Sequence, residues 1–189
     1  MENLDQEVQA ALDVLKKGGT ILYPTDTVWG IGCDATNPKA VEKVYALKRR
    51  NEQKALICLV SDEKMLEKHV YEVPEAAYDI LEHADKPTTI IYDKPIGVAE
   101  NLIGEDDTLA LRVVKDQFCQ QLLRKLRRPL VSTSANISGE KTPESFAQIA
   151  PEILKGVDYV VNLHRTRKTT KPSAIIKLTN SGIVKVIRK

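Results

Sequence analysis

Residues 20–33 read TILYPTDTVWGIGC, which places two short apolar segments on either side of a polar turn. The segments 20–23 and 28–33 are each predicted to form a buried strand. The two glycines of the second segment indicate that another backbone approaches it closely. The turn carries two hydroxyls and a carboxylate, from Thr25, Asp26 and Thr27. Because such residues often bond to their own backbone in turns, this segment is either an ordinary turn or the floor of a pocket.

Helices and strands alternate outward from this pair. An amphipathic helix ends at Gly18-Gly19, and Asn37-Pro38 supplies a cap and a first-turn proline for the next helix. Thr142-Pro143 predicts a second helix start of this kind. Further helices are predicted after Ser61, after Pro74 and over residues 116–126, and further strands over residues 55–60, 87–92, 108–114, 129–133, 158–163, 173–178 and 183–187. The pattern predicts an α/β fold, with one domain over residues 1–189 and an open sheet of mixed parallel and antiparallel strands flanked by helices.

The composition is that of an ordinary globular protein. The chain has 189 residues, 42% of them apolar and 29% charged, which argues against disorder and against a fibrous repeat. Cys33, Cys58 and Cys119 lie far apart without a CxxC pair, which favours a reducing compartment over a disulfide framework or a zinc ribbon. No apolar run reaches the ~20 residues of a membrane span, and the acidic amino terminus lacks the order of a signal peptide. We therefore expect a cytoplasmic protein with no membrane partner.

The charge is distributed unevenly, although the net charge is only +2. Residues 164–189 contain eight Lys or Arg and no acidic residue, so the first 163 residues carry an excess of six negative charges. A basic end on an acidic body suits an anionic ligand, either a nucleotide or a nucleic acid. The alternative is a solvated tail that keeps the protein soluble.

Several familiar catalytic patterns are absent from the sequence. It contains no GxxxxGK[ST] loop, no GxGxxG fingerprint and no GxSxG elbow. His69, His83 and His164 lack the spacing of metal ligands, and the cysteines have no histidine partner in the sequence pattern. We therefore expect neither covalent catalysis nor a protein-bound metal.

The basic segment Lys48-Arg49-Arg50 follows the helix that begins at Asn37-Pro38. On a continuing helix, Lys48 and Arg50 would point in directions about 200° apart. If the helix ends at Lys48, both side chains could converge on one anion. The alternative is that these are the basic residues that the carboxyl end of any exposed helix favours.

Polar clusters also follow or line the later strands. Residues 132–139, which read STSANISG, carry four hydroxyls and an amide directly after an apolar strand. Thr108 and Arg112 share one face of a predicted strand, and an inward-facing arginine suggests a carboxylate partner. Ser173 and Arg188 lie in the basic end. A pocket of hydroxyls and cations without metal or nucleophile suits phosphoanhydride binding with in-line transfer, where positioning and charge neutralisation supply most of the catalysis.

These motifs resemble those of the YrdC family, and the resemblance runs from about Gly18 to Arg188. Residues 23–33 are similar to the opening motif of the family, Lys48-Arg49-Arg50 to its Lys-x-Arg motif, and residues 129–139 to its Ser-Ala-Asn signature. The chain departs from the family pattern at Asn51, Ala55, Ala84 to Pro87 and Ala174. These departures leave a second hypothesis open, a non-catalytic or altered-substrate paralogue that binds tRNA or double-stranded RNA.

The resemblance implies a twisted open sheet with a large positively charged cavity, and the synthesis of threonylcarbamoyl-AMP. The substrates would be ATP, L-threonine and bicarbonate, with Mg²⁺ carried on the nucleotide. The product would serve the threonylcarbamoyladenosine modification of tRNA through downstream modification proteins.

The same resemblance implies roles for individual residues. Lys48 and Arg50 would be catalytic, because they would neutralise the phosphates. L-threonine would contact Thr25, Arg112 and Ser132. ATP would be held by Lys48, Thr108, Ser134, Asn136, Thr142, Ser173 and Arg188.

Overall fold

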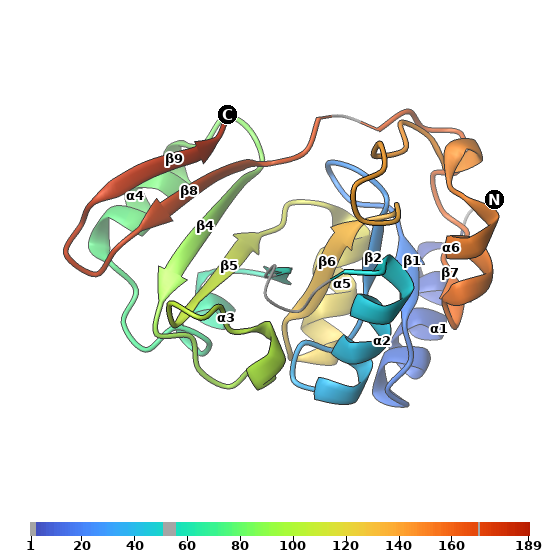
Figure 1. Cartoon of the computed structure of the whole chain (residues 1–189), viewed down its shortest axis with the longest axis horizontal. Coiled ribbons are helices and arrows are strands. Elements are labelled where there is room, and N and C mark those ends of the chain that lie inside the picture. The colour runs from blue at the N-terminus through green and yellow to red at the C-terminus, as the bar shows by residue number, and fades with distance from the viewer. Residues whose placement is uncertain (1–2, 51–55, 170) are drawn as a thin grey trace.

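The computed structural model describes residues 3–50, 56–169 and 171–189 (Figure 1). Six α-helices and two 3₁₀-helices occur in these ranges: α1 (Leu4–Lys16), α2 (Pro38–Lys48), α3 (Glu63–Glu67), α4 (Glu75–His83), α5 (Gln117–Leu126), α6 (Pro151–Gly156), η1 (Glu100–Leu102) and η2 (Phe146–Gln148). The strands are β1 (Ile21–Tyr23), β2 (Gly30–Gly32), β3 (Ile57–Val60), β4 (Thr88–Asp93), β5 (Thr108–Val113), β6 (Leu130–Ser134), β7 (Tyr159–Val160), β8 (Ala174–Leu178) and β9 (Val184–Arg188).

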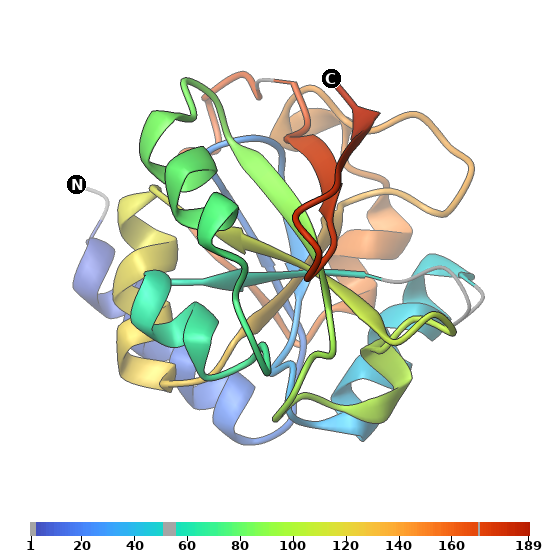
Figure 2. The same ribbon diagram turned by 90° about the vertical axis from the view of Figure 1, so that its left-hand side faces the viewer.

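These strands form one sheet in the order β7-β1-β2-β6-β3-β5-β4-β8-β9. The pairs β1·β7, β3·β5 and β4·β8 are parallel, and the other neighbouring pairs are antiparallel. The strands rotate strongly from one edge to the other, as the end-on view shows (Figure 2). The predicted α/β fold with a mixed open sheet is confirmed.

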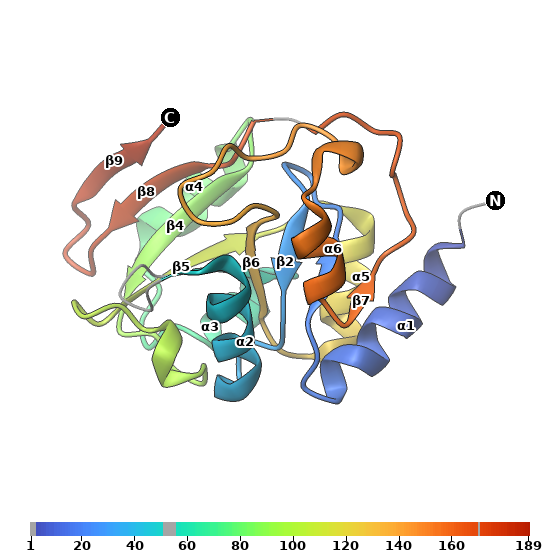
Figure 3. The same ribbon diagram turned by 45° about the vertical axis from the view of Figure 1, so that its right-hand side comes forward.

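The two faces of the sheet are covered to different extents. One apolar cluster packs α2, α3, α4 and α6 against alternate strand residues such as Cys58, Leu111 and Val131. The residues that alternate with these along each strand point to the opposite face of the sheet. On that face, α1 and α5 cover only one end of the sheet, around Leu59 and Leu130. Figure 3 shows α2 and α6 on one side of the central strands and α5 on the other. The rest of the second face, over β3, β5, β4 and β8, remains available for a site.

The glycines of β2 make room for Tyr23 of the neighbouring strand. The phenol of Tyr23 is buried and donates a hydrogen bond to the carbonyl oxygen of Val131 at 3.1 Å. Burial raises its pKa, so it remains a donor. A methyl group on Gly32 would overlap that carbonyl oxygen and lie 2.7 Å from Cε1 of Tyr23. The close backbone approach predicted for this strand is confirmed at Gly32.

Replacement of Gly32 with alanine should therefore lower the free energy of unfolding by roughly 1–3 kcal/mol, because the overlap involves backbone that cannot move aside. Gly30→Ala is the matched control, since its nearest neighbour would be Oγ of Ser132 at 3.3 Å. Chemical denaturation of both variants tests this. Equal losses would contradict the argument.

Most predicted elements occur near their predicted positions, but the helix predicted to start at Thr142-Pro143 does not. The chain there is irregular apart from η2, and the helix begins only at Pro151. A helix started at Pro143 would carry Pro151 in its interior, where the ring removes a hydrogen bond and clashes with the preceding turn. Proline also favours an extended residue before it, and Ala150 has φ −59° and ψ 139°.

Three smaller differences concern element ends. Asp62 caps α3 with its side chain, although Ser61 was the expected first residue of that segment. Only residues 159–160 of the predicted strand 158–163 pair with β1. Asn51 and Ala55, two of the departures from the family pattern, lie outside the described residues.

Candidate functional site

A cavity of about 310 Å³ opens on the part of the sheet face that α1 and α5 leave uncovered. Seven of the residues predicted for the site line it: Arg50, Arg112, Ser132, Ser134, Thr142, Ser173 and Arg188. Its floor is apolar, formed by side chains such as Ile57, Ile91 and Ile175. The structure therefore brings cations and hydroxyls from both halves of the chain to one cavity.

Strand register explains how these residues meet. Ile57 of β3 lies opposite Ser132 of β6 on one side and Ala110 of β5 on the other. Arg112 is two residues beyond Ala110, so its side chain points to the same face. At the far edge, Ile175 of β8 pairs with Arg188 of β9. The pattern predicted for Thr108 and Arg112 places both on this face, but Thr108 itself does not reach the cavity.

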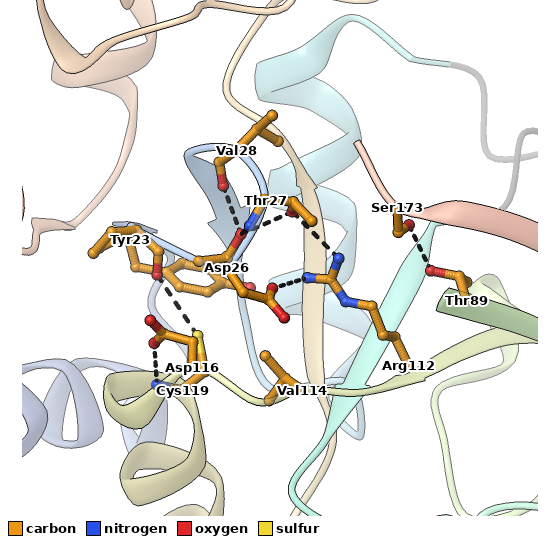
Figure 4. Close-up of polar contacts among 12 residues, drawn as sticks. Tyr23, Asp26, Thr27, Val28, Thr89, Arg112, Val114, Asp116, Cys119 and Ser173 are labelled. Atoms are coloured by element: carbon orange, nitrogen blue, oxygen red, sulfur yellow. Dashed lines mark hydrogen bonds and ion pairs between the residues drawn. The ribbon is translucent and has the colours of Figure 1, made fainter. Parts of the chain in front are cut away.

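The turn between β1 and β2 contacts the guanidinium group of Arg112 (Figure 4). Its Nη2 lies 3.1 Å from Oδ1 of Asp26, and its Nη1 donates to Oγ1 of Thr27 at 3.2 Å. Its Nε is buried and has no hydrogen-bond partner among the described residues. The carboxylate partner that the sequence predicted for Arg112 is therefore Asp26, and one guanidinium donor remains for a ligand.

The two interpretations of the basic segment differ in where α2 ends. The helix stops at Lys48, and Arg49 adopts a left-handed conformation with φ 50°. Arg49 turns outward to Glu152 at 2.6 Å, whereas Arg50 lines the cavity. Burial is the main cause that lowers the pKa of Lys48 to about 8, and the nearby charge of Arg50 adds to it. The helix therefore ends at Lys48, as the convergent interpretation requires.

Lys48 itself holds the loop that follows β6. Its buried Nζ donates to the carbonyl oxygens of Ser134 at 2.6 Å and Asn136 at 2.7 Å. The backbone N–H of Ser138 donates back to the Lys48 carbonyl oxygen at 2.9 Å. The ammonium group therefore acts on the loop in this structure, and Lys48 is not among the residues that line the cavity.

Three further predicted residues lie close to the cavity without lining it. The hydroxyl of Thr25 donates to the carbonyl oxygen of Val28 at 2.8 Å and accepts from the N–H of Thr27. The hydroxyl of Thr108 donates to Asp106 at 2.6 Å, and the amide of Asn136 donates to two carbonyl oxygens of its own loop. In this structure these side chains fix local backbone.

Arg188 is placed by β8. Its Nε and Nη2 both donate to the carbonyl oxygen of Ser173, at 3.0 and 2.7 Å. The hydroxyl of Ser173 is 2.8 Å from that of Thr89 (Figure 4). Burial lowers the pKa of Arg188, and so does the charge of Arg112. The field of one arginine thus reaches the other, and an anion between them would relieve the repulsion.

Some residues of the cavity were not predicted from the sequence. Thr27, Val28 and Thr133 line it beside the predicted residues. Thr133 stands between two predicted residues, and Thr27 and Val28 follow Thr25 in the same motif, so the motifs marked the right segments. Within the part of the chain that the structure describes, no group of three or more His, Cys, Asp or Glu side chains could hold a metal ion. No described helix is long and apolar enough to cross a membrane.

Comparison with known proteins identifies a family whose model matches most of the chain. The family model Sua5_yciO_yrdC, described as "Telomere recombination", matches residues 13–189. A protein of Methanocaldococcus jannaschii is 36% identical over 186 residues, which are 96% of this chain and 87% of that protein. A threonylcarbamoyl-AMP synthase of Idiomarina loihiensis is 34% identical over 170 residues, which are 88% of this chain and 91% of the relative.

Solved structures share the fold. YciO of E. coli superposes with a TM-score of 0.84 at 24% identity, over 99% of this chain and 90% of that chain. Sua5 of P. abyssi, solved in complex with L-threonine, gives a TM-score of 0.80 at 26% identity. That match covers 90% of this chain but 50% of the Sua5 chain, so this chain spans about half the length of that structure.

Proposed function

The chain belongs to the Sua5/YciO/YrdC family, and from this we propose that it is a threonylcarbamoyl-AMP synthase. It is a nucleotidyltransferase that forms threonylcarbamoyl-AMP and pyrophosphate for the modification of tRNA. Relatives of similar length named threonylcarbamoyl-AMP synthase support this assignment. The observation that carries it is the cavity in which Arg50, Arg112 and Arg188 meet the hydroxyls of β6.

In this proposal, the two substrates share the cavity. ATP lies against Arg50 and Arg188 and the hydroxyls of Ser134, Thr142 and Ser173, because several cations and small donors suit a triphosphate. Its Mg²⁺ arrives with the nucleotide. The carboxylate of L-threonine pairs with Arg112, whose Nε is free to donate. Ser132 lies on the next strand but one and lines the same cavity. Thr25 supports this end through Thr27.

The reaction proceeds in two steps. The neutral amine of threonine joins bicarbonate to form a carbamate, and water leaves. A carbamate oxygen then attacks the α-phosphorus of ATP, the bond to the β-phosphate oxygen breaks, and pyrophosphate leaves. Negative charge grows on the leaving group, and Arg50 offsets it. Removal of one such donor costs ~3 kcal/mol of transition-state stabilisation in comparable sites.

The remaining predicted residues act through the backbone in this proposal. Lys48 and Asn136 fix the end of β6, where Ser134 meets the nucleotide, and the loop that follows it. Thr108 fixes the start of β5 through Asp106. We place the reaction in the cytoplasm, with downstream tRNA-modification proteins as the consumers of the product.

The proposal is tested by incubating the protein with labelled L-threonine, bicarbonate and Mg-ATP. Pyrophosphate should appear only when threonine is present, together with a labelled adenylate. ATP binding without threonine-dependent pyrophosphate would reject the synthase. The non-catalytic RNA-binding alternative, which the named relatives do not favour, would instead give tRNA binding that falls steeply with salt and is unaffected by ATP.

Arg188 offers a sharper test of the nucleotide end. Arg188→Gln should raise the dissociation constant of ATP about tenfold, because a charge-assisted hydrogen bond to a phosphate is lost. The affinity for L-threonine should stay within about threefold. Lys189→Gln is the matched control, since Lys189 carries the same charge at the next position but does not line the cavity. Calorimetric titration of both variants gives the result, and equal losses would contradict the assignment.

A further inference from the structure

Asp26 is the only acidic partner that the structure gives to Arg112 among the described residues, and the pair is nearly enclosed. The side chain of Arg112 is 5% exposed and that of Asp26 is 19% exposed. A buried charge that loses its partner is strongly unfavourable, so one role of Asp26 is to balance Arg112. Its remaining exposure indicates that the carboxylate can also meet a ligand.

The pair stands between two hollows. Arg112 lines the cavity described above, and Asp26 borders a neighbouring hollow of about 310 Å³, together with Glu63, Thr88 and Lys115. Figure 4 shows Asp26 reaching from the turn toward the guanidinium group of Arg112. Because the guanidinium group of Arg112 lies 3.1 Å from Asp26, a small ligand bound to that group would come near the carboxylate.

The charges on the cavity wall limit what can bind the amino group of such a ligand. Of the described residues that line the cavity, three are arginines and none is acidic. An α-amino acid at neutral pH carries a carboxylate and an ammonium group on the same carbon atom. The carboxylate of the ligand can bind any of the three arginines. If it binds Arg112, the nearest protein carboxylate for the ammonium group of the ligand is that of Asp26.

We propose that Arg112 and Asp26 together recognise the zwitterion of the substrate, with Asp26 binding the ammonium group. The proposal rests on the proposed function, and it adds Asp26 as a specificity-determining residue. An ion pair of zero net charge then meets a ligand of zero net charge: its carboxylate binds the Nε of Arg112, and its ammonium group adds a second cation beside Asp26. A 2-hydroxy acid would satisfy Arg112 but bring no second cation to Asp26, and the site would discriminate against it.

The test uses the unmodified protein first. L-threonine, 2,3-dihydroxybutanoate of the same configuration and L-threoninamide are titrated by calorimetry. The second compound replaces the ammonium group with a hydroxyl, and the third removes the carboxylate charge. We expect both to bind at least about tenfold more weakly than L-threonine. If 2,3-dihydroxybutanoate binds as tightly as L-threonine, Asp26 is only the counterion of Arg112 and the proposal is overturned.

A variant gives an independent measurement. Asp26→Asn should weaken L-threonine binding about 10- to 100-fold but change the affinity for 2,3-dihydroxybutanoate by less than about threefold, so that discrimination is lost. Glu152→Gln, at the exposed ion pair with Arg49, is the control and should change neither. An Asp26→Asn protein that keeps its discrimination overturns the proposal. If the unmodified protein binds ATP but not L-threonine, the proposed function fails instead.

Discussion

Lys48→Met should lower the rate of threonine-dependent pyrophosphate release about 100-fold or more. The side chain of Lys48 is buried, and its Nζ holds the carbonyl oxygens of Ser134 and Asn136 at 2.6 and 2.7 Å. Methionine keeps the length of the side chain but donates no hydrogen bond. Two buried carbonyl groups would then lose their donor, and the end of β6 with Ser134 and the loop that follows it would shift. A displacement of about 1 Å in a catalytic group costs about 100-fold in rate.

Lys43→Met is the control for this variant. Lys43 lies on the same helix and also donates to a backbone carbonyl oxygen, that of Gly18 at 3.0 Å, but at an exposed position. Its replacement should leave turnover within about twofold. Steady-state assays of both variants at saturating ATP and threonine make the comparison. Turnover of Lys48→Met within threefold of the unmodified protein would contradict the role assigned to the loop.

The depressed pKa of Lys48 adds a pH dependence with a defined sign. It is lowered from 10.5 to about 8, first by burial and then by Arg50. Between these values the unfolded chain binds more protons than the folded one, so this group makes the free energy of unfolding rise with pH. Loss of its charge above about pH 8 should also weaken ATP binding. Lys48→Met, measured alongside between pH 7 and 10, should lack both changes.

The sequence predicted the architecture because its signals are local. Asn37-Pro38 starts α2, and Asp116 caps α5 through the N–H of Cys119, as expected for residues of these types. The strands alternate so that Ile57, Ala110 and Ser132 share a face, and the polar residues after them meet at one cavity. A local pattern of this kind does not depend on contacts between distant segments.

Two points that the sequence left open depend on distant contacts. The side chain of Lys48 turns away from the cavity because it bonds to residues 86 and 88 positions away in the sequence. The sequence did not show which carboxylate pairs with Arg112, because Asp26 and Thr27 lie similarly far from Arg112 along the chain. The predicted helix at Thr142 failed for a local reason, because Pro151 outweighed the cap-like pair before it.

Arg112→Lys should raise the Michaelis constant for L-threonine about 100-fold and leave the dissociation constant of ATP within about threefold. Arg112 uses Nη2 for Asp26 and Nη1 for Thr27, and its buried Nε has no hydrogen-bond partner among the described residues. In the proposed function this third donor binds the carboxylate of threonine. A lysine ammonium group is a point charge and cannot keep both partners while presenting a third donor along a planar edge. Lysine also retains the positive charge, so Asp26 is not left as an uncompensated buried anion.

Arg49→Lys is the control, because it makes the same substitution in an ion pair whose side chains are 68% and 51% exposed. Such an exposed pair contributes little, so both Michaelis constants should stay unchanged. A rise in the constant for ATP equal to that for threonine would show that Arg112 serves the nucleotide. In that case the Arg188→Gln variant should also change threonine binding, because the charges of Arg112 and Arg188 act on each other across the cavity. The two arginine variants are therefore expected to separate the substrates, with Arg112→Lys acting on threonine and Arg188→Gln on ATP.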